Sequence, residues 1–104
     1  MPFGSFVNAL PPVVFLVIHL VLFIIGAVFA YRAFSADAPY LGWAFSLFAL
    51  AEVVYMTYHL DWTVFLFAHT IAEVLDLVAF VLVFVSATRR VFSMTRRHAT
   101  APAE

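Results

Sequence analysis

Six side chains that can ionise interrupt long apolar stretches of this sequence, and their types are those of acid–base and metal chemistry. They are His19, Glu52, His59, His69, Glu73 and Asp76. A charge at the centre of a bilayer costs at least ~2.5–3.5 kcal/mol on insertion scales. Side chains of this kind in an apolar chain therefore face the interior of a bundle, pair with one another or hold a ligand.

The spacing of these residues predicts that they meet in one place. Along the third apolar stretch, His69, Glu73 and Asp76 stand at i, i+4 and i+7, which is one face of a helix. With a rise of about 1.5 Å per residue, three of the residues from three different helices lie about 10 Å below the outer ends of those helices. The predicted outer-half pocket contains His19, Glu52, His69 and Glu73, with His59 at its mouth.

Two imidazoles and one or two carboxylates at a common depth are the ligand types of zinc, non-haem iron and copper sites. The first hypothesis is therefore a bound transition metal ion (Cu, Fe or Zn) that serves storage, transfer or redox chemistry in a larger assembly. Its expected ligands are His19, Glu52, His69, Glu73 and His59. Asp76 and Tyr55 are expected to orient these ligands or to relay protons.

Three alternatives use the same residues. The first is a structural or assembly subunit, in which hydrogen-bonded His–carboxylate pairs form a polar core. The second is an electron-transfer subunit in which His19 and His69 ligate haem b. The third is a proton relay that descends from the outer face. The chain has no nucleophile–base pair and no Gly-rich phosphate loop, so the sequence leaves enzymatic activity open.

Composition determines the class of protein that must position these side chains. Of the 104 residues, 66% are hydrophobic and only 11% are charged, whereas a soluble domain is about half apolar and a quarter charged. This excludes a free-standing soluble domain and an intrinsically disordered chain. The absence of cysteine excludes disulfides, Cys-type zinc sites and iron–sulfur clusters. A formal net charge of -1 gives no support for nucleic-acid binding.

The apolar residues form three runs, over residues 12–33, 39–60 and 62–88, each near the roughly 20 residues that cross a bilayer. They predict an all-α, integral membrane three-helix bundle of antiparallel, up-down-up topology. The whole chain, 1–104, is expected to be one membrane domain with a polar cytoplasmic tail over 89–104 that frays. Asp37 and Asp61 are expected to cap the N-termini of the second and third helices.

The basic residues predict the orientation of the chain in the membrane. All five are arginines, and they stand at the end of the first span or after the third: Arg32, Arg89, Arg90, Arg96 and Arg97. By the positive-inside rule, the N-terminus lies outside and the C-terminus in the cytoplasm of a cell or inner membrane. Besides the lipid bilayer, a homo-oligomer or a larger membrane complex is expected as partner, because three short helices bury little area.

Overall fold

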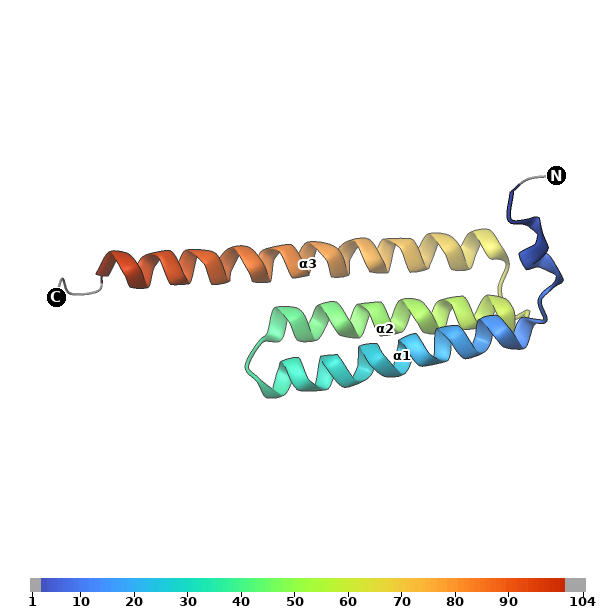
Figure 1. Ribbon diagram of the computed structural model, residues 1–104, viewed down its shortest axis with the longest axis horizontal. Coiled ribbons are helices and arrows are strands. Elements are labelled where there is room, and N and C mark those ends of the chain that lie inside the picture. Colours follow the sequence, from blue (N-terminus) through green and yellow to red (C-terminus); the bar gives the residue numbers. More distant parts are fainter. Residues whose placement is uncertain (1–2, 101–104) are drawn as a thin grey trace.

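The computed structural model describes the backbone of residues 3–100 and the side chains as far as residue 96. A short 3₁₀ helix, η1 (Ser5–Ala9), precedes three long helices. These are α1 (Pro12–Ser35), α2 (Pro39–His59) and α3 (Phe65–Thr100). They run antiparallel to their neighbours in sequence (Figure 1). The predicted all-α, three-helix, up-down-up fold is confirmed.

Each long helix is long and apolar enough to cross a membrane. The spanning segments are Pro12–Ser35, Pro39–His59 and Phe65–Arg96, with 24, 21 and 32 residues. Because roughly 20 residues suffice to cross the hydrocarbon, the chain is a small integral membrane protein. Proline at the start of α1 and α2 lacks an N–H that would in any case have no intrahelical partner there.

The helices form a flat layer with α2 in the middle. Both α1 and α3 pack against α2, and among the described residues no α1 Cα lies within 8 Å of an α3 Cα. Figure 1 shows α2 between its two neighbours. The buried apolar side chains of the described residues are all alanines: Ala30, Ala44, Ala49, Ala51, Ala68, Ala72 and Ala79. Small residues let helix backbones approach closely in lipid, where dispersion contacts rather than the hydrophobic effect hold helices together.

Two glycines set the distance between α1 and α2. A Cβ added at Gly26 would lie 2.9 Å from Phe48 Cδ1 and 3.2 Å from the Cβ of Ala49. A Cβ added at Gly42 would lie 2.7 Å from three carbons of the Phe34 ring. Each glycine therefore accepts a side chain of the opposite helix at the place where any other residue would hold the two helices apart.

Both connecting turns use aspartate in a left-handed conformation, and this corrects the predicted helix caps. Asp37 has φ 57° and Asp61 has φ 61°. Each donates its backbone N–H to the carbonyl three residues earlier, Phe34 and Tyr58 respectively. The next residues, Ala38 and Trp62, donate to Ala33 and Thr57. These bonds define Schellman motifs, so each aspartate ends the helix before it and caps no N-terminus after it.

The third helix differs from its predicted range at both ends. It begins at Phe65 rather than at residue 62, because the Schellman turn occupies Asp61 and Trp62, and the Oγ1 atoms of Thr57 and Thr63 lie 3.0 Å apart across the turn. The expected frayed tail over 89–104 is helical as far as Thr100, and residues 101–104 lie outside the described residues. Residues 89–100 contain neither glycine nor proline to end the helix.

Candidate functional site

A polar pair joins α1 to α2 in the half of the molecule near the α2–α3 turn. The Nδ1 atom of His19 lies 2.5 Å from Oε2 of Glu52. Glu52 is 5% exposed and is the one buried charged residue among those described. The pair shares a helical stripe with the close approach at Gly26, because Gly26 follows His19 by two turns. The glycine thus draws α1 onto α2, and the pair forms on the same contact face.

Four stacked rings hold this pair in place. Their order is Phe15, His59, His19 and Tyr55, so that successive rings come alternately from α1 and α2. Ring centroids are 5.0 Å apart for Phe15–His59, 5.3 Å for His59–His19 and 5.0 Å for His19–Tyr55, with interplanar angles of 6°, 25° and 16°. Interleaved rings of this kind restrict the rotation of the His19 side chain, so its Nδ1 is kept towards Glu52.

A second hydrogen bond extends the cluster to α3. The Tyr55 hydroxyl donates to Oε1 of Glu73 over 2.9 Å. Two hydrogen-bonded pairs, His19–Glu52 and Tyr55–Glu73, therefore cross the two helix–helix contacts of the layer, and the stack of His19 on Tyr55 connects them. We call these four residues the polar network.

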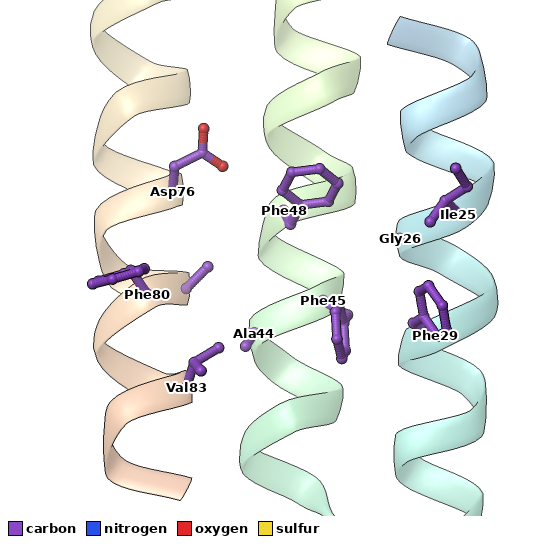
Figure 2. A pocket seen from close by; sticks show the side chains of 10 residues that line it. Ile25, Gly26, Phe29, Ala44, Phe45, Phe48, Asp76, Phe80 and Val83 are labelled. Atoms are coloured by element: carbon purple, nitrogen blue, oxygen red, sulfur yellow. The ribbon is translucent and has the colours of Figure 1, made fainter. Parts of the chain in front are cut away.

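Asp76 lies one helical turn beyond Glu73, towards the middle of the layer. Its Oδ1 is buried and is the one such side-chain atom of the described residues without a hydrogen-bond partner. Figure 2 shows its carboxyl group directed from α3 towards α2, at the upper end of a groove lined by all three helices. The groove has a volume of about 400 Å³. The polar network and the groove thus lie in succession along one side of α2, with Asp76 where they meet.

The structure brings together only part of the residue set predicted for the pocket. His19, Glu52 and His59 are neighbours, and Glu73 joins them through Tyr55. His69 does not take part: it is exposed, and its ring stacks on Phe65 of its own helix at 5.2 Å. The expected meeting of imidazoles from the first and third spans is absent because α2 separates α1 from α3. Because α3 begins only at Phe65, His69 also lies just one turn after the N-terminus of its helix.

The donor atoms are arranged for hydrogen bonding rather than for a shared ion. Imidazole lone pairs lie in the plane of the ring, and the stacked rings of His19 and His59 direct them sideways in nearly parallel planes. Nδ1 of His19 is occupied by Glu52. Among the described residues, no group of three or more His, Asp or Glu side chains is placed to hold a metal ion.

The end of the layer near the α2–α3 turn has a cavity next to the polar network. This cavity of about 360 Å³ lies between η1 and the turn, and its lining includes Asn8, His59 and Asp61. His59 touches this cavity on one side and the His19 ring on the other. The stacked column therefore begins at a polar cavity and leads to the buried Glu52.

The opposite end of the layer is basic. Arg89 donates from Nη1 to the Tyr40 hydroxyl over 3.0 Å, and its guanidinium carbon lies 5.1 Å from the centroid of the Tyr40 ring. Arg32, Arg89 and Arg90 line a cavity of about 710 Å³ between the α1–α2 turn and α3. Sequence reasoning missed the Arg89–Tyr40 contact, and also missed Phe15. The position of Phe15, one helical turn before His19, is the signal that could have revealed its place in the stack.

Comparison with known proteins adds no relative: no family model, no curated protein and no solved structure matches the chain.

Proposed function

We propose that the polar network is an intramembrane acid–base centre that takes up and releases protons through the cavity beside His59. The observation that carries this proposal is the buried Glu52 carboxyl group 2.5 Å from His19 Nδ1, within segments that span a membrane. Proton relays in membrane proteins use carboxylates and imidazoles in contact, because an imidazole changes charge near neutral pH and a carboxylate beside it can accept its proton.

The His–Glu pair limits the charge that proton exchange places in hydrocarbon. A proton on either partner gives a pair with no net charge, so its movement between Nδ1 and Oε2 leaves the membrane interior neutral overall. A lone carboxylate at this depth would bear a cost of at least ~2.5–3.5 kcal/mol each time it ionised. The Tyr55 hydroxyl donates a hydrogen bond to the second carboxyl group, Glu73, but does not neutralise its charge.

The path that this network offers ends inside the membrane. From the cavity near the turn, His59, His19 and Glu52 follow one another through ring contact and a hydrogen bond. Beyond Asp76, α3 has no titratable side chain before Arg89. A path open at one end serves a reaction or ligand within the membrane rather than conduction across it.

Two other hypotheses from the sequence stay predictions. One is a transition metal ion with His19, Glu52, His69, Glu73 and His59 as ligands. It requires the exposed His69 side chain to leave its stack on Phe65 and turn towards α2. Haem b ligated by His19 and His69 requires these residues to meet across α2 or between two copies of the chain. Elemental analysis and an absorption spectrum of protein purified without chelator test both: a stoichiometric metal or a Soret band lost in His69→Ala would support them. The absence of both a bound metal and a Soret band would count against both hypotheses.

The proton-exchange proposal is tested by infrared difference spectroscopy of protein in lipid nanodiscs during acidification. We expect a carboxyl carbonyl-stretch band to appear together with imidazole changes, and to shift in D₂O because its proton exchanges with solvent. Glu52→Gln should remove the Glu52 component of the band. His19→Phe keeps a flat ring in the stack but has no ring nitrogen, so the imidazole changes that accompany the band should be reduced.

The matched control is Glu73→Gln, which removes the second carboxyl group and leaves the first pair in place. If the bands of Glu52→Gln and the wild type are the same, or if folded wild-type protein shows no exchange in D₂O, the proposal is refuted. The structural alternative would then hold, and substitutions in the polar network would change stability alone.

A further inference from the structure

The groove below the polar network has the form of a site for a flat, lipophilic molecule. Its volume is about 400 Å³, within the ~300–1,000 Å³ of small-molecule pockets. Four phenylalanines from the three helices line it; in Figure 2 the ring on α3 is directed away from α2, and the other three belong to α1 and α2. The four are Phe29, Phe45, Phe48 and Phe80. Aromatic side chains prefer offset or edge-on contact with other rings, so this lining favours a ligand with a ring.

One polar atom at the end of the groove is without a partner. Oδ1 of Asp76 is buried and makes no hydrogen bond, although Asp76 lines the groove. Buried polar groups in proteins are almost always hydrogen-bonded, so a missing partner is expected in the space that this carboxyl group faces. That space is the upper end of the groove, beside Phe48 and Gly26 (Figure 2).

The properties of the occupant follow from these contacts. Asp76 is the one ionisable residue in the lining, all other lining residues are apolar, and the groove borders segments that face hydrocarbon. The occupant is therefore neutral and lipophilic, carries a ring and has an oxygen that hydrogen-bonds to a carboxyl group. An acyl chain fits the apolar walls but has no such oxygen at mid-membrane depth, so it would leave Oδ1 unpaired.

We propose that this groove binds the head ring of an isoprenoid quinone or quinol. A quinol hydroxyl donates to Oδ1 of the Asp76 carboxylate, or a quinone carbonyl accepts from the protonated Asp76 carboxyl group. The ring packs among the phenylalanines, and the tail leaves through the open side of the groove into lipid. The inference deepens the proposed function, since it names the class of molecule at the inner end of the polar network. The proposal concerns binding of the ring alone, at a carboxyl group that lies one helical turn from Glu73 of the polar network.

The binding test uses decylubiquinone, with decylbenzene as a probe that has a ring and the same tail but no ring oxygens. Equilibrium dialysis against wild-type protein in nanodiscs should show saturable binding of the quinone and only lipid-like partitioning of decylbenzene. Asp76→Leu should weaken quinone binding roughly tenfold, the factor that about one net hydrogen bond supplies. Asp76→Asn keeps a donor and an acceptor and should retain binding.

A second pair of variants keeps the test informative if Asp76→Leu fails to fold. Ala79→Phe fills the groove, since Ala79 lines it and is 7% exposed, and should abolish quinone binding. Val78→Phe adds the same ring to an exposed position outside the lining and should not. Equal partitioning of both probes, or equal binding by both phenylalanine variants, would overturn the inference. A groove closed by a second copy of the chain, detected as dimer cross-links through Val83→Cys, would also overturn it.

The quinone proposal and the proton-exchange proposal fail separately. Dialysis measures binding at constant pH and does not depend on whether Glu52 exchanges a proton. The infrared titration needs no quinone. Loss of quinone binding with an intact Glu52 band would leave an acid–base centre with a different occupant, whereas the reverse result would leave a ligand site without proton exchange.

Discussion

Removal of the imidazole nitrogen that binds Glu52, without removal of its ring, isolates the central hydrogen bond of the site. His19→Phe makes this change, because phenylalanine keeps a flat ring between His59 and Tyr55, where centroid distances are 5.3 and 5.0 Å. Glu52 is 5% exposed, and His19 is its one hydrogen-bond partner among the described residues. The variant therefore leaves a buried carboxyl group without a partner.

The expected magnitude lies between two limits. Interhelical hydrogen bonds in membranes average ~0.6 kcal/mol and reach ~1.7 kcal/mol, whereas a buried polar group left unpaired costs ~1–3 kcal/mol. Since Glu52 is almost fully buried, we expect His19→Phe to lower the free energy of unfolding by about 2 kcal/mol. Glu52→Leu should cost about 1 kcal/mol, because His19 is less buried than Glu52 and can remain neutral.

The assay is a double-mutant cycle from SDS-induced unfolding in mixed micelles, followed by circular dichroism. The double variant, His19→Phe with Glu52→Leu, removes both polar groups and leaves neither unpaired. We expect its loss of stability to be at least about 1 kcal/mol smaller than the sum of the single losses. Additivity within ~0.3–0.5 kcal/mol, the range found for independent sites, would refute the argument that the two groups depend on each other.

Three further outcomes follow from the fold. Gly26→Ala should lower stability by ~1–3 kcal/mol in the same assay. The loss should exceed that of Gly42→Ala, because the three atoms nearest the new Cβ at Gly26 include the Cβ and backbone nitrogen of Ala49, whereas the three nearest at Gly42 all belong to the half-exposed Phe34 ring. Asp37→Gly should raise stability by about 1 kcal/mol, since φ is 57° there, and a gain equal to that of Asp37→Ala would contradict this reason. In a chain without other cysteines, Ser5→Cys should react with an impermeant maleimide on intact cells and Ser93→Cys only after lysis. The opposite labelling would reverse the predicted orientation.

The sequence predicted the helices well because the signal for a membrane span is long and redundant. Some 20 consecutive apolar residues tolerate single errors in assignment, so the three runs map onto α1, α2 and α3. The turns carry no such redundancy. Asp37 and Asp61 read as N-caps, since aspartate is common there, but both adopt the left-handed conformation that glycine usually supplies at a helix C-terminus.

Part of the site was predicted from the sequence. The part that was not depended on how the three helices are placed relative to one another, rather than on the depth of each residue along its helix. Depth along a helix follows from residue number, so His19 and Glu52 were correctly placed at one level, and they form a hydrogen bond. Whether three helices close into a ring or lie side by side is not encoded in spacing along any single helix. Because α2 lies between α1 and α3, His69 and His19 face different neighbours although their depths were predicted to match.

The contact face of α2 is polar near the α2–α3 turn and apolar towards the arginine end, so the two ends of the layer differ. A helix in the middle of a layer can contact both neighbours through one stripe, and on α2 that stripe carries Phe48, Glu52, Tyr55 and His59 at spacings of three and four residues. Near the α2–α3 turn its members are polar and pair with both neighbouring helices. Towards the arginine end they are aromatic and leave a groove. Asp76 stands at this change in polarity with an unpaired oxygen, so it is the position at which a proton from the network and a ligand from the lipid would meet.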